Sequence, residues 1–535
     1  MKKKACLLLL SAALLLGVSQ NARAIDFKVK GEWIMNFDIG ANGAFTGGSG
    51  LTGYNGSQGG NGSNRGDDQF NASQRLRLFL DAVASESLSG TVAIEIGDTK
   101  WGRSAQGGAL GADGTIVEIK HAYLDWIMPQ TDLKIRMGIQ GFYLPSFTTG
   151  SQILADDLPG IMLNLPVNEN VSLTAFWGRP LNDNSTGPKA NQANYMDNMD
   201  MFGLLVPLSF DGVKVTPWAM AAAIGPNAWR NGNDAFGNHS PNTIGTTAWG
   251  PLHTMLPAWG VIGSDGRRIA AAKTHAYATA WWAGLTGDIQ AFAPFRIAFD
   301  FNYGSVNYGA SRLNRNGWLA SLLFEYKLDW GIPGLYGWYA SGDDSDLGNG
   351  SERLPGVSTF NNHNNFSNYG FNGHNYIGRE GVIAGSMAGT WGVGARLKDV
   401  VLPWVEDLKH TLRLNLMGGT NDHRLLKKMH NADLYPTANG QLYDARGDNV
   451  YAGAGWIYGA PGVEAMYLTD RDTALEVGLT STWTVYENLS LILDTAYMAL
   501  WLDKGRNVWG GSRMNGKDDT TRDSWNVNLT FYYTF

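Results

Sequence analysis

The sequence predicts an all-β fold, namely a transmembrane antiparallel up-and-down β-barrel of about 18 strands, with 16 as the alternative count. Three observations predict it. Apolar and polar residues alternate along many short segments. The connections between these segments alternate between short and long. The chain also begins with a secretory leader and ends on an aromatic segment. Strands of this kind can form a wall with lipid on one side and water on the other.

The first 24 residues have the composition of a secretory signal peptide. Three lysines precede the apolar stretch ACLLLLSAALLLGV, and ARA at residues 22–24 is a small-x-small cleavage site. This pattern predicts a mature chain that starts at Ile25, with an uncleaved anchor as the alternative. The only cysteine, Cys6, lies in this leader, so the mature chain is expected to form no disulfide.

Composition narrows the class of protein further. Without Lys2, Lys3, Lys4 and Arg23, the chain holds 37 basic against 48 acidic residues, a net charge of −11, which argues against a nucleic-acid partner. No second apolar run is long enough for a transmembrane helix. Aromatic residues make up 12% of the chain and glycine occurs 69 times, which suits a barrel wall. Residues 25–535 are therefore expected to form a single barrel domain.

Alternation is already clear in the first predicted strand. DFKVKGEWIMNFDI places Phe27, Val29 and Trp33 on one face and Lys28 on the other, with Ile34 as an exception. Soluble sandwiches contain similar strands, so this pattern alone does not decide the fold. The predicted strands are 26–39, 74–84, 88–97, 116–126, 132–140, 158–167, 171–178, 199–209, 213–223, 274–286, 295–303, 317–327, 335–341, 389–398, 409–419, 473–484, 489–501 and 524–535.

The connections favour a membrane barrel. Short ones, such as SES, IMPQT, NEN, SFDG, DWGIPG and VYEN, alternate with long ones. Outer-membrane barrels have short periplasmic turns and long outer loops, and an even strand number places both termini in the periplasm. The long connections are 40–73, 98–115, 141–157, 179–198, 224–273, 342–388, 420–472 and 502–523, with 304–316 of moderate length.

Basic residues recur on the polar face of these strands. In a barrel with an apolar exterior they would line the lumen, where charged side chains set ion selectivity. The alternative is that they are ordinary solvated charges. The predicted pore-lining basic residues are Arg75, Arg77, Lys134, Arg136, Arg296, Arg396 and Arg413. The first four, on early strands, are predicted to form part of a constriction wall.

Several segments resemble Gram-negative general porins. They are the leader followed directly by IDFKVKGEW, then HAYLDW, RMGIQGFYLP, WYASGDD and the terminal FYYTF. Together they are most similar to the homotrimeric porins of sulfate-reducing, Desulfovibrio-type bacteria. The resemblance spans the whole mature chain and implies a homotrimer.

The resemblance also implies two sets of functional residues. The loop GFYLPSFTTGSQILADDLPG would fold inward and place Asp156 and Asp157 opposite the basic wall; the alternative is an outer loop with two exposed acids. The terminal Phe535, with Tyr533 and Phe531 at alternate positions before it, resembles the signal read by the outer-membrane assembly machinery.

Other chemistry has little support in the sequence. DDSDLGNGSE offers Asp344, Asp346 and Asn349 as a weak calcium candidate, but the EF-hand order is missing, so no metal is expected. No histidine or cysteine pattern indicates a catalytic site, and neither an enzyme nor a cofactor is expected.

These features predict a water-filled channel for passive diffusion of small hydrophilic solutes and ions, in the outer membrane of a Gram-negative bacterium. The alternative is a substrate-specific channel or an adhesive barrel that binds through its long outer loops. A barrel enzyme and a soluble secreted sandwich are more distant alternatives. The sequence leaves open the solute, the sign of ion selectivity and the trimer face.

Overall fold

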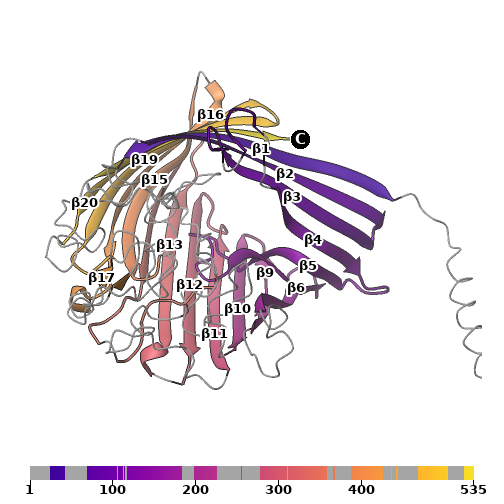
Figure 1. Cartoon of the computed structure of the whole chain (residues 1–535), viewed down its shortest axis with the longest axis horizontal. Helices are drawn as coiled ribbons and strands as arrows, with labels where there is room; N and C mark the ends of the chain where they lie inside the picture. The colour runs from indigo at the N-terminus through magenta and orange to yellow at the C-terminus, as the bar shows by residue number, and fades with distance from the viewer. Residues whose placement is uncertain are drawn as a thin grey trace, which may run out of the picture.

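Most of the described chain lies in one antiparallel sheet, which closes on itself as a barrel (Figure 1). The computed structural model describes residues 25–41, 69–104, 107–112, 114, 117–182, 198–225, 255, 277–309, 311–346, 348–357, 366–367, 387–403, 405–425, 435–436, 442–443, 468–503 and 523–535. The predicted leader, residues 1–24, lies outside them. No helix among the described residues is long and apolar enough to cross a membrane.

The wall strands pair in chain order around the barrel. They are β1 (Asp26–Ala41), β2 (Gln69–Ser85), β3 (Leu88–Lys100), β4 (Val117–Ile127), β5 (Lys134–Tyr143), β6 (Ala155–Pro166), β7 (Ser172–Asn182), β8 (Asn198–Leu205), β9 (Leu208–Phe210), β10 (Val213–Ile224), β11 (Ala278–Ile289), β12 (Phe295–Asn307), β13 (Arg315–Tyr326), β14 (Ile332–Ala340), β15 (Thr390–Leu402), β16 (Val405–Gly419), β19 (Thr473–Tyr486), β20 (Leu489–Trp501) and β21 (Ser524–Thr534). A separate short pair is formed by β17 (Tyr435–Pro436) and β18 (Leu442–Tyr443).

The barrel has 18 strand positions. Its sheet holds 19 labelled segments, but β8 and β9 pair one after the other with β10 and form one strand interrupted at Val206 and Pro207. The last strand pairs with the first, from Glu32 opposite Thr534 to Ala41 opposite Trp525. The predicted all-β barrel and its count of 18 are therefore confirmed, and the alternative of 16 is wrong.

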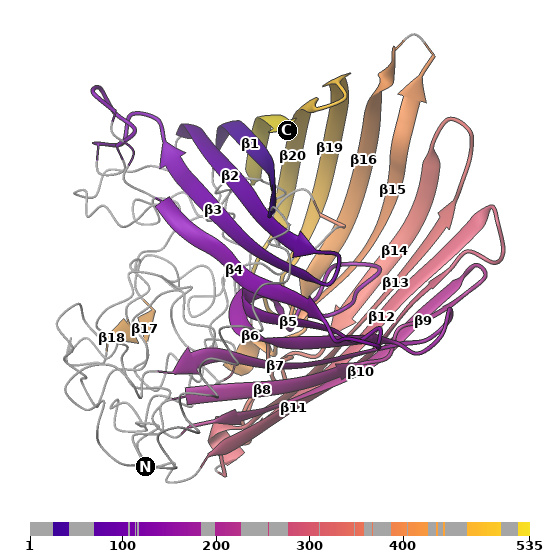
Figure 2. The same cartoon turned by 90° about the vertical axis from the view of Figure 1, so that its right-hand side faces the viewer.

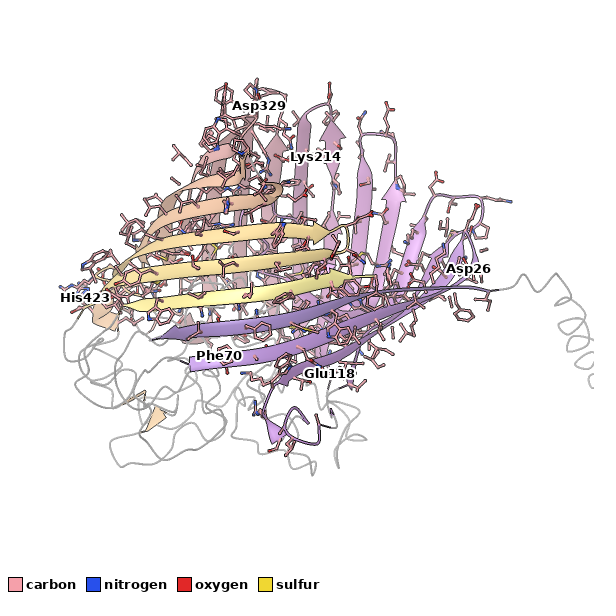
Figure 3. The ribbon with its side chains drawn as sticks, turned by 90° about the horizontal axis from the view of Figure 1, so that it is seen from above. Asp26, Phe70, Glu118, Lys214, Asp329 and His423 are labelled. Carbon is pink, nitrogen blue, oxygen red and sulfur yellow. The ribbon has the colours of Figure 1, made fainter. Side chains whose placement is uncertain are left out.

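Short and long connections lie at opposite ends of the barrel. The chain turns within a few residues from β2 to β3, from β9 to β10 and from β19 to β20, whereas the connections at the other end include 42–68 and 341–389. In Figure 3, Asp26, Lys214 and Asp329 mark the end with the turns. Phe70, Glu118 and His423 mark the end with the long connections (Figure 3). The chain enters the wall at the start of β1 and leaves it at the end of β21, and both points lie at the turn end (Figure 2).

The two faces of the wall differ in chemistry. Apolar side chains such as Phe27 and Leu335 point outward and are exposed, whereas Asn36, Asn528 and Thr530 are buried on the inner face. The Asn36 amide donates to Asn528 Oδ1 and Thr530 Oγ1, both at 2.9 Å, across the closing seam. A closed wall of this kind satisfies all its backbone groups in lipid.

The last residue completes the seam. Gly31 N–H donates to the Phe535 carbonyl at 2.8 Å, and Phe535 N–H donates to the Gly31 carbonyl at 3.0 Å. The Phe535 ring lies over Gly31, where an added Cβ would come within 2.5 Å of it, so glycine is required for this approach. The Phe535 and Tyr533 rings lie 5.7 Å apart at 28°.

Candidate pore constriction

One hairpin leaves the wall. Strands β5 and β6 pair along their whole length, but β4 pairs with β5 only up to Ile139 and β7 pairs with β6 only from Gly160. Residues 140–158, here called the inner hairpin, therefore have no wall strand on either side among the described residues. Gly138 lies where it departs, with a φ of +134° that residues with a side chain rarely adopt.

The inner hairpin crosses the lumen and reaches the far side. Its tip contacts the inner faces of β12 and β13, where the Ser146 hydroxyl donates to Asp300 Oδ2 at 2.5 Å. The Thr148 and Ser321 hydroxyl oxygens are also 2.5 Å apart. The loop after the fifth strand thus folds into the barrel and does not extend outward.

One face of the inner hairpin is apolar and packs against the wall. Phe142 and Phe176 meet edge to face at 5.3 Å, and Leu154 and Leu158 are buried beside them. The wall supplies inward apolar residues from β8 to β14: Met199, Met201, Trp218, Met220, Ala280, Trp282, Ala298, Leu319, Leu323, Tyr336 and Trp338. This inner core was not predicted, because the polar face of every strand was expected to meet water. Burying one such large side chain stabilises by about 1.5–3 kcal/mol.

The opposite face of the inner hairpin is polar and faces β4. Asp157 Oδ2 lies 2.5 Å from Lys120 Nζ, and Asp157 Oδ1 lies 2.9 Å from His121 Nε2. The Tyr143 hydroxyl donates to Asp157 at 3.3 Å. The Asp156 carboxylate accepts a hydrogen bond from the Asp157 backbone N–H at 2.8 Å. Asp157 therefore contacts basic side chains of β4, close to the point where the inner hairpin leaves the wall.

Sequence reasoning missed Lys120 and His121 as partners of the acidic loop. Strict alternation puts neighbours on opposite faces, so both could not be assigned to the lumen. The pairing of β3 with β4 skips Lys120, since Ala93 lies opposite His121 and Ile94 opposite Ile119. This bulge lets both side chains reach Asp157. The only sequence signal was the adjacent pair of basic residues in IKHAY.

Arg75 and Arg77 lie on the inner face of β2. One strand, β3, separates β2 from β4. Arg75 makes two hydrogen bonds of 2.7 Å with Asp98, and Arg77 bonds to Glu95 at 2.6 Å and to Glu32 at 2.8 Å. Since all these carboxylates belong to the wall itself, the arginines are held in fixed positions by bidentate or bridging pairs. We call Arg75, Arg77, Lys120 and His121 the basic wall.

Lys134 and Arg136 share one acidic partner at the turn end of β5. Arg136 makes two hydrogen bonds of 2.7 Å with Asp125, and Lys134 Nζ lies 3.1 Å from the same carboxylate. The Arg136 guanidinium also stacks 4.0 Å above the Tyr123 ring. Lys134 and Arg136 therefore lie in the part of β5 that belongs to the wall, between the turn end and the inner hairpin.

The remaining three predicted residues form a third group on the other side of the barrel. Arg296 bonds to Asp288 and Glu325, both at 2.7 Å, and Arg396 bonds to the same Glu325 at 2.6 Å. Arg413 lies directly opposite Arg396 in the register and donates to Thr480 at 3.0 Å. The structure thus divides the seven predicted basic residues into three clusters: Arg75 with Arg77, Lys134 with Arg136, and these three.

In most of these pairs the cation is more exposed than the carboxylate. The exposed fractions are 66% for Lys30 and 21% for Asp81, and 44% for Lys134 and 15% for its partner. Arg296 follows the same order, at 29% against 9% for Asp288. Arg75 and Asp98 reverse it. In most of these pairs the cation is therefore more accessible to water than its carboxylate partner, whereas Lys120 and His121 are about as exposed as Asp157.

A second segment enters the lumen beside the third group. Phe366 is fully buried and stacks on the Tyr336 ring at 4.1 Å and 11°. Its carbonyl accepts hydrogen bonds from Tyr336 at 3.0 Å and Asn415 at 2.7 Å. Ser367 donates to Glu476 at 2.7 Å. This segment, from the connection between β14 and β15, narrows the side of the lumen away from the basic wall.

The calcium candidates form hydrogen bonds within their own loop. Asp344 accepts hydrogen bonds from the Asp346 backbone and the Asn349 side chain, and Asp346 accepts one from Gly348. Their oxygens thus stabilise a local turn.

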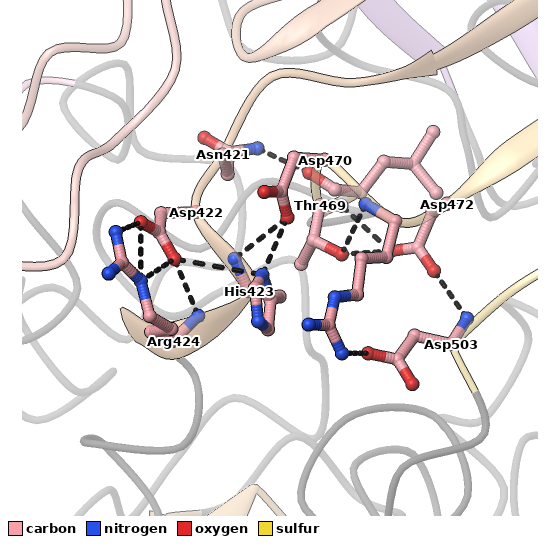
Figure 4. Close-up of polar contacts among 10 residues, drawn as sticks. Asn421, Asp422, His423, Arg424, Thr469, Asp470, Asp472 and Asp503 are labelled. Carbon is pink, nitrogen blue, oxygen red and sulfur yellow. Dashed lines mark hydrogen bonds and ion pairs between the residues drawn. The ribbon is translucent and has the colours of Figure 1, made fainter.

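A different set of carboxylate and imidazole atoms comes together after β16. Within the described ranges, Asp422, His423 and Asp470 have such atoms within 4.8 Å of one another (Figure 4). Arg424 already makes a bidentate ion pair with Asp422, at 2.5 Å for the shorter contact, and His423 bonds to Asp470 at 2.9 Å. The arrangement is a satisfied salt-bridge cluster.

The sequence matches no protein-family model and no curated protein. Among solved structures it is similar to OpdQ, OpdL and the outer membrane protein OprD of Pseudomonas aeruginosa. OpdQ has a TM-score of 0.46 at 12% identity and covers 95% of this chain and 98% of its own. OpdL has 0.46 at 10%, with 95% and 99% covered. The outer membrane protein OprD has 0.45 at 11%, with 97% and 95% covered. The fold stated above rests on the strand pairing of this chain.

Proposed function

We propose that this protein is an outer-membrane porin that forms a water-filled channel for passive diffusion of small hydrophilic solutes and ions. One observation carries the proposal: a closed 18-strand wall with an apolar exterior encloses a hairpin that packs one apolar face on the wall and turns one polar face toward basic side chains. Such a wall is stable in lipid, and such a lumen filters solutes by width and charge. The proposed activity is transport without catalysis or cofactor.

The proposed channel prefers anions. The support is the greater exposure of cations such as Lys30, Lys134 and Arg296 compared with their carboxylate partners. A permeating ion interacts most strongly with the charges nearest to it, and carboxylates behind the cations are farther away. The net negative charge of the chain opposes this preference only weakly, because exposed charges beyond about 8–10 Å are screened at physiological salt.

The remaining elements of the proposal follow from the sequence. Residues 1–24 act as a cleaved leader, and Phe535, Tyr533 and Phe531 act as the signal for the outer-membrane assembly machinery. A homotrimer is proposed from the resemblance of the sequence to homotrimeric porins. Asp156 and Asp157 act as the acidic side of the constriction, and the seven basic residues line the pore.

A substrate-specific channel is the second candidate. The inserted Phe366 and Ser367 favour it, because a lumen narrowed from two sides leaves less room for unselective passage. The adhesive alternative depends on the connections 224–273 and 342–388, which lie largely outside the described residues.

Planar-bilayer recording of purified protein tests the proposal. We expect discrete conductance steps, a reversal potential in a KCl gradient that reports anion preference, and closure in groups of three for a trimer. Saturation of conductance by one solute at low concentration would favour the substrate-specific channel. Absence of any channel from refolded, heat-modifiable protein would reject the porin.

A further inference from the structure

We propose that Asp300 is a positioning residue that latches the inner hairpin to the far wall and so sets the width of the pore. The inference rests on the proposed function for its consequence in transport. Its structural part, the latch, can be tested without any channel measurement.

Asp300 is buried, with 3% of its surface exposed, and points inward from β12. It accepts hydrogen bonds from the Ser146 hydroxyl at 2.5 Å and from the backbone N–H groups of Phe147 and Thr148, both at 3.0 Å. The Thr148 hydroxyl and the wall residue Thr286 also donate to it. No ion pair joins Asp300 to a basic residue of the described chain. A buried carboxylate without a cation depends on such donors, and most of them come from the hairpin.

The latch holds the part of the hairpin that lies farthest from the wall strands β4 and β7. The stem of the hairpin leaves the wall at Ile139 and Gly160, so the tip is the part farthest from covalent support. Apolar packing along its inner face is strong but non-directional. Directional hydrogen bonds at Asp300 fix where the tip lies, and therefore how far Tyr143 and Asp157 stand from the basic wall.

The tip has a second support that keeps latch variants folded. The Val357 N–H donates to the Ile153 carbonyl at 2.7 Å, and the Met387 N–H donates to Gln152 Oε1 at 3.2 Å. These contacts come from the connection between β14 and β15 and do not involve Asp300. Loss of the latch should therefore loosen the hairpin without releasing it from the lumen altogether.

An amide cannot replace the carboxylate. The N–H groups of Phe147 and Thr148 can only donate, and they approach different carboxylate oxygens. In Asp300→Asn, one of the two would face an NH₂ group and lose its acceptor. Thr148→Val removes a hydroxyl from the loop side of the same contact. The matched control is Thr149→Val, since the Thr149 hydroxyl bonds only to the Gly150 carbonyl in its own loop, at 3.1 Å.

The structural test is hydrogen exchange of the full chain in detergent. We expect residues 144–154 to exchange at least about tenfold faster in Asp300→Asn and Thr148→Val than in the wild type, because one hydrogen bond to a charged group contributes that much protection. Thr149→Val should exchange like the wild type. Unchanged exchange in both latch variants would overturn the proposal, whether or not the protein conducts.

The transport test is single-channel recording of the same proteins. Both latch variants should show larger mean conductance and added substates, with Thr149→Val unchanged. In Asp300→Asn that also carries Thr148→Cys and Ser321→Cys, a disulfide should restore wild-type conductance and a reductant should remove it, since the two hydroxyl oxygens are 2.5 Å apart. If the wild type conducts and the latch variants behave identically to it, the latch does not set the pore width. If Asp300→Asn fails to fold, Thr148→Val and the pair Thr148→Cys and Ser321→Cys in a chain that keeps Asp300 decide, the pair by comparing conductance before and after reduction.

Discussion

Removing the charge of Asp157 should shift the channel toward anions. In Asp157→Asn the partners Lys120 and His121 stay in place but lose their counter-charge at 2.5 Å and 2.9 Å. The constriction thereby gains one positive charge with little change in volume. The Asp157 side chain is 19% exposed, so its substitution leaves the Lys120 ammonium without its nearest counter-charge on the polar face of the inner hairpin.

The size of the shift can be worked from Coulomb's law. An anion passing about 5 Å from the Lys120 ammonium in water-like surroundings gains about 0.8 kcal/mol, since the energy of two unit charges is about 332/(εr) kcal/mol. That energy changes relative occupancy roughly fourfold. The same charge lowers the occupancy of a cation by about the same factor. We therefore expect the anion-to-cation permeability ratio to rise about sixteenfold, and to rise less at high salt, where the interaction is screened.

Reversal potentials in a KCl gradient measure this ratio. The control is Asp399→Asn, which removes a carboxylate 3.5 Å from Lys398 at the turn end of β15, away from the inner hairpin. Asparagine also tolerates the positive φ of 54° at that position. A ratio that stays constant in Asp157→Asn, or moves toward cations, would refute the assignment of Asp157 to the constriction.

Three further predictions test other parts of the molecule. Phe366→Ala should raise conductance, because it empties the ring site on Tyr336, and bilayer recording would show no change if the segment lay outside the ion path. Deleting Phe535 should reduce the amount of heat-modifiable barrel in the outer membrane several-fold, and normal assembly would reject the signal. Burial, together with nearby acidic groups, raises the pKa of Glu352 to about 7. Its protonated form therefore stabilises the loop fully below about pH 4.5, and this stability is lost as pH rises through 7. Protease cleavage near Glu352 should increase from pH 5 to pH 8 in the wild type but not in Glu352→Gln.

The wall of the barrel was predictable because its determinants are local. Strands such as β1 and β21 alternate almost throughout, so their apolar face, the short turns along the chain and the count of 18 follow from the sequence. The exception at Ile34 has a simple explanation, since this side chain is buried on the inner face of the barrel. The pairing of β1 with β21 removes a sheet edge that would be unstable in lipid.

The contents of the lumen were less predictable because they depend on contacts between distant segments. In β10, Trp218, Met220 and Ala222 face inward while Ala219 and Ala221 face outward, so the alternation that identifies the lipid face is absent. An apolar inner face indicates that another segment covers it, but the sequence does not identify that segment. The bulge at Lys120 and the contact of the hairpin tip with Asp300 likewise have no local signature.

The inner hairpin separates two properties of the proposed channel. Its tip, held by Asp300, determines how much of the lumen is closed, whereas its polar face, through Asp157, determines the charge beside the part that stays open. Variants at Asp300 and Asp157 should therefore change different properties of the channel. Asp300→Asn should change conductance with little effect on the permeability ratio, and Asp157→Asn should change the ratio with little effect on the number of substates. If each variant changed both properties equally, the hairpin would move as one rigid unit, and width and charge could not be assigned to separate ends of it.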